Sequence, residues 1–143
     1  MLQAGSAVQK VWIRHGDRAW DLQVVLEVDQ ASLRFLAFAM EQPVLRLTWD
    51  GNAEQRWSSQ DVPEDFDPEL ILEDLILIRA HATQLQRELP SGWQLLDRTD
   101  RRELLHRGRV RTRIQMRGET YLIEHPQWGM HVEVVERVLE AVP

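Results

Sequence analysis

The feature that most constrains the fold is an alternation of apolar and polar residues between Trp20 and Val28, interrupted at Val25. A period of two places the apolar side chains on one face of an extended strand and the polar ones on the other. A helix would scatter the same residues around its circumference. The segment is therefore predicted to be a half-buried β-strand. Its apolar face consists of Trp20, Leu22, Val24, Leu26 and Val28.

Comparable runs, separated by turn-forming residues, fill the rest of the first 60 residues. Leu33–Met40 is apolar on both faces, which predicts a strand that is covered on both sides. At least four hairpin-linked strands are expected in this half of the chain. The predicted strands lie at about 10–14, 20–28, 33–40, 44–49 and 53–58, with turns at 15–17, 29–32, 41–43 and 50–52.

An acidic loop at 61–67 leads into a segment with a helical period. Asp67 is expected to cap this helix, Pro68 to occupy its first position and Pro90 to end it. Residues 70–78 are apolar on more than one side, so the helix is expected to face more than one apolar surface. A bend or break is predicted near 79–83.

From residue 93 onward the period of two returns, with hairpin signals at 107–108, 117–118 and 125–129. No linker or repeat separates the parts of the chain. The sequence therefore predicts a single antiparallel α+β domain over residues 1–143. It would have strands at about 8–59, a helical insertion at about 67–89 and further strands at about 93–139.

Composition and motifs narrow the possible chemistry. The chain has no cysteine, which rules out disulfides, thiolate metal sites and cysteine nucleophiles. The net charge of −6 argues against a general nucleic-acid binder, and no run of about 18 apolar residues suggests a transmembrane helix. Nucleophile motifs, phosphate-binding glycine loops and metal-ligand spacings are missing from the sequence, so we expect no catalytic residue, cofactor or metal.

The titratable residues are interpreted as surface groups. The paired carboxylates Glu73 and Asp74 are expected on a solvated acidic face, because nothing in the sequence requires their burial. The histidines, among them His125 and His131, are expected to be exposed or to lie at a rim.

Arginines recur at every second position over most of residues 107–117. Such a basic face suits anionic lipid headgroups or an acidic partner, whereas nucleic acid is disfavoured because no aromatic side chains are interleaved for base stacking. Simple cross-strand pairing with Glu103, Glu119 and Glu124 is the structural alternative. The arginines predicted to share this face are Arg107, Arg109, Arg111, Arg113 and Arg117.

The six tryptophans outnumber phenylalanine and tyrosine together. Trp20, Trp49 and Trp93 begin or end predicted apolar strand faces, where a large amphipathic ring suits the mouth of an apolar cavity. Packing within a core is the more common use of such rings, and the pattern alone leaves both uses open.

Four short motifs are spread over nearly the whole chain: Leu33–Leu36, Leu45–Gly51, Leu70–Ile78 and Leu85–Pro90. These motifs and the order of the elements resemble those of the Lol lipoprotein carriers (LolA/LolB-like) of the Gram-negative envelope. The chain is most similar to an uncharacterised family of small envelope lipoproteins within that superfamily.

The resemblance implies a strongly curved, unclosed β-barrel, or half-barrel, whose apolar concave side is covered by a helical lid inserted between two groups of strands. The enclosed hydrophobic cavity would hold acyl chains. The turn at 40–43 would be a membrane-contact loop, with Met40 as its candidate residue. The residues expected to contact a hydrophobic ligand are Trp20, Leu22, Val24, Leu26, Phe35, Leu47, Trp49, Leu75 and Ile78.

Residues 1–10 lack the charged start and apolar stretch of a secretory signal. Relatives of this kind carry a signal peptide, and many have a lipid-modified cysteine at the mature start. Our preferred interpretation is that the start of this chain replaces both. The resemblance then implies a periplasmic protein that is anchored to the outer membrane in its full-length form.

The leading functional hypothesis is a non-enzymatic, monomeric envelope protein that binds or transfers a lipid, an acyl chain or a lipoprotein acyl group. Its partners would be this cargo and a membrane surface or an envelope transport component, and not nucleic acid. One alternative is a small enzyme that acts on a lipid-linked substrate with His125 as its base. Another is an interaction module that docks an acidic partner or a membrane surface through the arginine face.

Overall fold

The computed structural model describes residues 4–29, 31–60 and 68–141 and consists of one curved sheet and two short helices. The first five strands are β1 (Gly5–His15), β2 (Arg18–Val28), β3 (Leu33–Ala39), β4 (Gln42–Trp49) and β5 (Glu54–Ser58). The helices are α1 (Pro68–Arg79) and α2 (Ala82–Glu88). The remaining strands are β6 (Trp93–Asp97), β7 (Arg101–His106), β8 (Arg109–Arg117), β9 (Thr120–His125) and β10 (Met130–Ala141).

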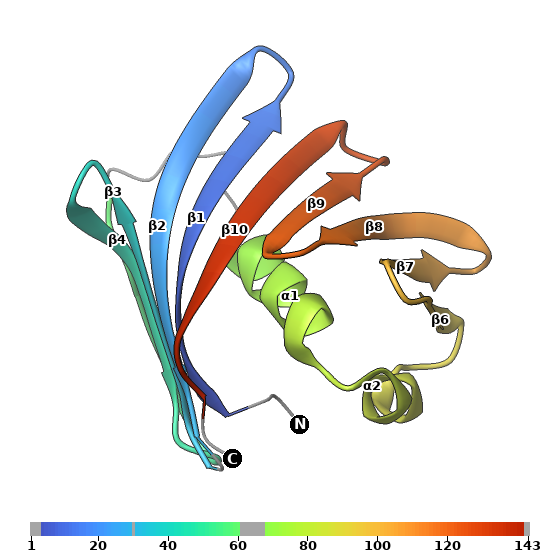
Figure 1. Ribbon diagram of the computed structural model, residues 1–143, viewed down its shortest axis with the longest axis horizontal. Coiled ribbons are helices and arrows are strands. Elements are labelled where there is room, and N and C mark those ends of the chain that lie inside the picture. Colours follow the sequence, from blue (N-terminus) through green and yellow to red (C-terminus); the bar gives the residue numbers. More distant parts are fainter. Residues whose placement is uncertain (1–3, 30, 61–67, 142–143) are drawn as a thin grey trace.

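All ten strands belong to a single sheet in the order β5-β4-β3-β2-β1-β10-β9-β8-β7-β6, and each pair of neighbours is antiparallel. The edge strands β5 and β6 do not pair with each other, so the sheet is unclosed. It curves around α1 and α2, which lie on its concave side (Figure 1). The prediction of an antiparallel, curved and unclosed sheet with a helical insertion is confirmed.

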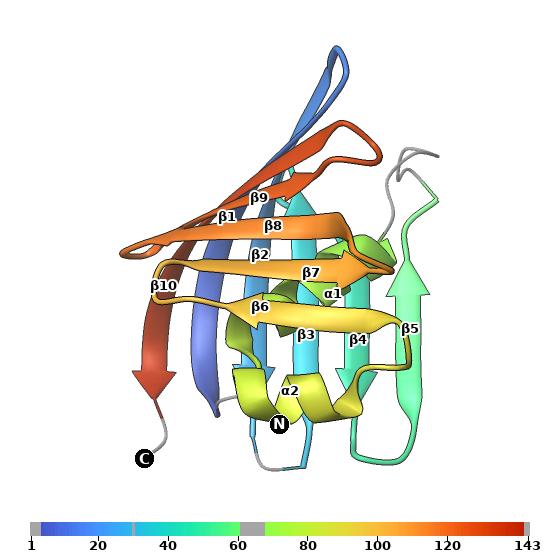
Figure 2. The same ribbon diagram turned by 90° about the vertical axis from the view of Figure 1, so that its right-hand side faces the viewer.

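The first and last strands of the chain pair with each other. β1 and β10 are in register from Gly5 opposite Ala141 to His15 opposite Met130, with one bulge between Ser6 and Ala7. This pairing joins two meanders, β1–β5 and β6–β10, into one sheet (Figure 2). The strands of the second meander run across those of the first, because the sheet twists strongly between them.

The alternation seen in the sequence decides which face of the sheet is buried. In β2, Leu22, Val24 and Leu26 are buried, whereas Asp21, Gln23 and Glu27 are exposed and Val25 is half-buried. The same parity continues into the neighbouring strands, where Phe35 pairs with Leu26 and Leu47 pairs with Phe35. These side chains define the inner, concave face of the sheet.

Two details of β3 differ from the prediction. Leu36 and Phe38, on its outer face, are only half-buried, because the described helices lie on the other side of the sheet and only strands flank these residues. The strand ends at Ala39 and β4 begins at Gln42. The turn therefore consists of Met40 and Glu41, and not of residues 41–43 as predicted. The prediction that this strand is covered on both sides was therefore wrong.

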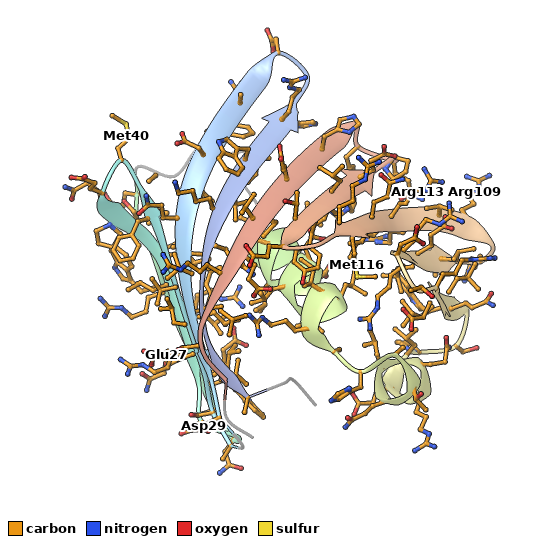
Figure 3. The ribbon with its side chains drawn as sticks, viewed as in Figure 1. Glu27, Asp29, Met40, Arg109, Arg113 and Met116 are labelled. Atoms are coloured by element: carbon orange, nitrogen blue, oxygen red, sulfur yellow. The ribbon has the colours of Figure 1, made fainter. Side chains whose placement is uncertain are left out.

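The Met40–Glu41 turn has an unusual backbone. Both residues have positive φ, 50° for Met40 and 66° for Glu41. A two-residue hairpin turn with two positive φ values matches the right-handed twist of the strands, but asparagine and glycine are the usual residues there. Met40 is 93% exposed and projects from the tip of the turn (Figure 3).

The two helices confirm the predicted break. Helix α1 ends at Arg79 and α2 starts at Ala82, while the expected cap Asp67 lies outside the described residues. On α1 the buried residues Leu70, Ile71, Leu75 and Leu77 join the core, and Leu72, Ile76 and Ile78 pack against it half-buried. Apolar contacts therefore lie on more than one side of α1, as expected from the sequence.

Helix α2 protects one edge of the sheet. The backbone N–H of Leu95 in edge strand β6 donates a hydrogen bond of 2.8 Å to Oε1 of Gln86 in α2. An edge strand with unpaired donors invites pairing with other chains, and covering it with a helix prevents this. Strand β5 forms the other edge, and all of its residues are exposed.

Replacing Phe35 with Ala tests the assignment of the inner face. Phe35 is 1% exposed, so its loss leaves a cavity and is expected to lower the free energy of unfolding by about 3–5 kcal/mol. Phe38→Ala in the same strand removes the same group from the half-buried outer face and is expected to cost about 1 kcal/mol. Denaturant unfolding of both variants gives the comparison, and equal losses would contradict the assignment.

Candidate functional site

The concave face is the part of the molecule that gathers most of the predicted ligand-binding residues. Trp20 and Ile78 are half-buried and pack against the core cluster. Trp49 lies outside the cluster at the end of β4 and is 44% exposed. The predicted residues that are buried in the cluster are Leu22, Val24, Leu26, Phe35, Leu47 and Leu75.

This apolar cluster is built from both the sheet and the helices. Val24 and Leu26 have no exposed surface, and Leu75 of α1 is 2% exposed. Helix α1 thus covers part of the inner face of the sheet, which would otherwise be exposed to solvent (Figure 1). An apolar ligand on this face would meet side chains of α1 as well as those of the strands.

Half-buried apolar residues mark one rim of the concave face. Trp20 starts the inner face of β2, and Ala39 and Val44 flank the Met40–Glu41 turn; all three pack against the core cluster. Because neighbouring strands are antiparallel, this rim also contains the β1–β2, β7–β8 and β9–β10 turns and the start of β6. We call this edge of the sheet the turn rim.

A buried polar chain connects α1 to the sheet close to the turn rim. Nε2 of His125, at the end of β9, lies 2.9 Å from Oδ2 of Asp74 in α1. Nδ1 of His125 lies 3.3 Å from Oγ1 of Thr112 in β8. Asp74 is 4% exposed and His125 is not exposed at all. The interpretations of Asp74 as part of a solvated acidic face and of His125 as a surface group were therefore wrong.

Burial has the largest effect on the pKa of Asp74 in this chain of buried polar residues. It raises the pKa of the Asp74 carboxyl, and the hydrogen bond and charge of His125 offset part of that effect. Oδ1 of Asp74 has no hydrogen-bond partner among the described residues. The hydroxyl, imidazole and carboxylate stand in the order used by hydrolases, but all three side chains are buried, so a substrate does not reach them. Their structural effect is to tie α1 to β8 and β9.

A second buried polar cluster lies further along α1. Arg79 forms an ion pair with Glu136 of β10. Glu136 also accepts hydrogen bonds from Nε2 of Gln9 at 3.3 Å and from the Tyr121 hydroxyl at 3.4 Å. Burial and the neighbouring Glu136 raise the pKa of Tyr121. This cluster joins α1 to β1, β9 and β10.

An arginine of the sheet holds the last turn of α1. Nη1 of Arg102 donates to the backbone oxygens of Leu77 at 2.7 Å and Ala80 at 2.8 Å, and Nε donates to Asp97 at 2.8 Å. These carbonyls have no partner within the helix, and a cation at a helix C-terminus is favourable. Helix α1 is thus held by directional polar contacts to β7–β10.

Sequence reasoning missed these buried polar residues, although a signal exists. Asp74 stands within a helix that is apolar on more than one side, so one residue of the Glu73–Asp74 pair had to face the interior. Gln9 and Glu136 stand on the same parity as buried apolar neighbours of their strands. A polar residue at a strand position that shares its face with buried apolar residues indicates a buried polar site.

The predicted arginine face is divided in the structure. Thr112 pairs with Leu104 and Val110 with Leu105, so Arg111 is an extra residue in β8 and forms a bulge. Arg113 makes the expected cross-strand ion pairs, 3.3 Å to Glu103 and 3.2 Å to Glu124. It points away from α1, whereas Met116 of the same strand lies toward it (Figure 3).

The other arginines of this set have separate environments. The Cζ atom of Arg111 lies over the rings of Trp93, at 5.1 Å from the centroid, and Trp128, at 5.0 Å. Arg107 has a φ of 51° in the β7–β8 turn, and Arg109 and Arg117 are exposed at opposite ends of β8. The bulge at Arg111 breaks the alternation on which the prediction of one shared face rested.

None of the six tryptophans is fully buried, and Trp20 is the member of the set that packs against the core cluster among the described residues. Trp20 and Trp93 are half-buried. The others are partly exposed: Trp12 (42%), Trp49 (44%), Trp57 (46%) and Trp128 (41%).

A groove lies on the outer face where the two meanders meet. Its volume is about 840 Å³. Its lining is mixed, with Trp12 and Leu122 beside charged side chains of both signs, including Arg14 and Glu133. Among the predicted ligand-binding residues, Trp20 contributes to it. The mixed lining distinguishes this groove from the inner face of β2–β4, which is apolar.

Two further properties of the described part of the chain bear on the site. Within residues 4–29, 31–60 and 68–141, no three His, Asp or Glu side chains are grouped so that they could hold a metal ion. The helices in these ranges are too short or too polar to cross a membrane.

Fold and site together define a curved, unclosed antiparallel sheet that encloses an apolar face and an internal helix. Residues 6–137 match the protein family described as “Protein of unknown function (DUF3261)”, and the chain belongs to this family. A comparison with curated proteins finds no match.

Replacing Asp74 with Asn tests the buried carboxyl. Because burial raises the pKa of Asp74 above its ordinary 3.8, the folded protein binds this proton more tightly than the unfolded chain does. The contribution of Asp74 to the free energy of unfolding is therefore present at low pH and decreases as the pH rises above about 4. The Asn variant is expected to gain stability relative to the natural protein over this range.

Denaturant unfolding between pH 4 and pH 8 measures this difference. Glu73→Gln is the matched control, because the neighbouring carboxylate is exposed and its removal is expected to leave the pH dependence unchanged. Parallel curves for Asp74→Asn and the natural protein would show that Asp74 does not titrate abnormally.

Proposed function

We propose that this protein is a non-enzymatic binding or transfer protein of the cell envelope. Its cargo is a lipid, an acyl chain or the acyl group of a lipoprotein, held between the concave face of the sheet and the helices. The observation that carries this proposal is the inner face of the sheet, which is apolar without interruption over β2, β3 and β4 and which only α1 and α2 cover among the described elements. The similarity of the element order to the Lol carriers supports the same role.

The energetics of an apolar cargo suit this face. Removing apolar surface from water contributes about 25 cal/mol per Å², so a long acyl chain gains several kcal/mol without polar recognition. Trp20, Ala39 and Val44 at the turn rim are half-buried, as are Leu72 and Ile76 of α1. Cargo that covers them would bury apolar surface that the protein leaves partly accessible.

In this proposal α1 acts as a lid. Its apolar contacts with the sheet are non-directional and can be exchanged for contacts with an acyl chain. Its polar contacts through Asp74, Arg79 and the Arg102-bound carbonyls keep it attached to β7–β10. Cargo would therefore enter between α1 and the strands of the first meander, while the helix stays attached to the second.

Met40 supports a role at a membrane surface. It is an exposed apolar side chain at the tip of a strained turn on the turn rim, and strain of this kind often accompanies function. We propose that this turn contacts the membrane, or an envelope transport component, when cargo is exchanged. The protein would act as a monomer at the periplasmic side of the outer membrane.

A non-enzymatic role is favoured by the position of an arrangement that resembles a catalytic triad. Thr112 of β8, His125 of β9 and Asp74 of α1 are buried between the helix and the sheet, with exposed fractions of 4%, 0% and 4%. A nucleophile must reach its substrate, and this hydroxyl does not.

Titration with dodecanol, followed by tryptophan emission and by native mass spectrometry, tests the proposal. Saturable binding of one molecule is expected. Ile76→Gln places an amide at a half-buried site on α1 and is expected to weaken binding about tenfold. Val25→Gln, at a half-buried aliphatic site on the outer face of β2, is the matched control with unchanged affinity. No saturable binding to the natural protein would refute the proposal.

Replacing Met40–Glu41 with Asn–Gly tests the turn. Residues suited to positive φ are expected to raise the free energy of unfolding by about 1–2 kcal/mol. If the turn serves membrane contact, the same change is expected to reduce association with phospholipid vesicles in a flotation assay. Met40→Leu keeps an apolar tip and is expected to retain association. Unchanged flotation of the Asn–Gly variant would contradict the membrane role.

A further inference from the structure

Arg111 is held by aromatic rings from two other parts of the chain. Its Cζ atom lies 5.1 Å from the ring centroid of Trp93 and 5.0 Å from that of Trp128. Trp93 begins β6, and Trp128 lies in the β9–β10 turn. Separate elements therefore converge on one guanidinium at the turn rim.

The backbone places this side chain by a specific device. Arg111 is the extra residue of the β8 bulge, and a bulge redirects a side chain relative to the regular alternation. Further ring contacts surround this site. The ring centroids of Trp93 and His106 are 4.5 Å apart, and those of Trp128 and His125 are 5.7 Å apart. The guanidinium is thus positioned by packed rings instead of by a carboxylate.

These contacts leave the hydrogen-bonding capacity of Arg111 unused. Ring contacts hold a guanidinium through its charge, whereas its five N–H donors need acceptors. Among the described residues, the guanidinium of Arg111 has no hydrogen bond or ion pair, while those of Arg102 and Arg113 in the same sheet have both. Arg111 is half-buried, so it is open to a ligand from one side. A hydrogen-bond acceptor from outside the protein would use the free N–H donors of this guanidinium.

The charge around Arg111 favours an anion. Arg107 and Arg109 are its neighbours at the same corner, and neither is ion-paired with another described residue. The protein as a whole carries a net charge of −6, so a cationic corner stands out against its surroundings. Guanidinium groups bind carboxylate and phosphate oxygens with paired hydrogen bonds.

The location connects this corner to the apolar face. Trp93 and Trp128 share the turn rim with Trp20 and Met40, and Thr112 next to Arg111 faces the buried chain that reaches α1. A cation at the rim and an apolar face behind it match the two ends of an anionic amphiphile. We propose that Arg111 binds the carboxylate or phosphate headgroup of an amphiphile whose apolar chain lies on the concave face, an inference that rests on the proposed function.

A purely structural clamp is the competing explanation. Such a clamp would join β6, β8 and the β9–β10 turn, and its loss would affect stability and all ligands alike. A headgroup site has a different signature, because it distinguishes ligands of equal chain length by charge. The preference for a charged over a neutral headgroup is therefore the decisive measurement.

The experiment compares dodecanoate with dodecanol at pH 8, below their aggregation limits, by isothermal titration of the full chain. We expect dodecanoate to bind about tenfold more tightly, as for a hydrogen bond to a charged group. Arg111→Gln is expected to abolish this preference and leave the affinity for dodecanol unchanged. Acetate, which has the headgroup without the chain, is expected not to bind measurably.

Arg117→Gln is the matched control, since it removes the same charge from an exposed position at the other end of β8. It is expected to keep the tenfold preference. Circular dichroism checks the fold of each variant. If Arg111→Gln does not fold, Arg111→Met tests the same point, because a methionine packs well between aromatic rings.

The outcomes separate the two proposals. A preference that persists in the folded Arg111 variant, or equal affinity of the natural protein for both ligands, overturns the headgroup site and leaves the proposed function standing. Failure of both ligands to bind the natural protein overturns the proposed function together with this inference. Binding of acetate alone as tightly as dodecanoate overturns the coupling of headgroup and chain.

Discussion

The pairing of β1 with β10 is the constraint on which the rest of the structure depends. It brings Gly5 opposite Ala141 and His15 opposite Met130, across nearly the full length of the chain. Without it the protein would be two separate meanders, and each would have an apolar face without enough other structure to cover it. With it the two faces become one concave surface. Helices α1 and α2 then lie inside the curve, where α1 supplies apolar cover.

A helix inside a curved sheet must satisfy its polar groups in a largely apolar environment. The structure does this with Asp74 on His125, Arg79 on Glu136, and Arg102 on the carbonyls at the end of α1. All of these partners lie in β7–β10, so the polar contacts of α1 are concentrated on the second meander. Gln9 of β1 belongs to the Glu136 cluster, but it bonds to Glu136 and not to α1, so no direct polar contact between α1 and the first meander is found among the described residues. This asymmetry makes an apolar cargo on that side physically reasonable, because its entry breaks no hydrogen bond.

The turn rim gathers the features that bear on function. It contains the strained Met40–Glu41 turn, the half-buried Trp20 and the aromatic contacts of Arg111. The antiparallel topology alone brings these residues, distant in sequence, to one edge. Apolar, aromatic and cationic groups along an edge of an apolar face suit a molecule with a long apolar chain and an anionic end. The buried His125 links this edge to α1, since it contacts both Trp128 and Asp74.

The sequence by itself determined the strands, the helix pair and the inner face, because hydrophobic period and turn chemistry are local properties. Leu22, Val24 and Leu26 were placed correctly on that basis, whereas Leu33–Met40 is apolar on both faces and its period did not single out the side of Phe35 as the buried one. It did not determine the burial of Asp74 and His125, the division of the arginines by the bulge at Arg111, or the exposure of the tryptophans. These properties arise from strand register and from which elements cover each other, and both are fixed by contacts between residues far apart in the chain. Only the tertiary structure decided them, since a period of two identifies the residues that share a face but not what lies opposite that face.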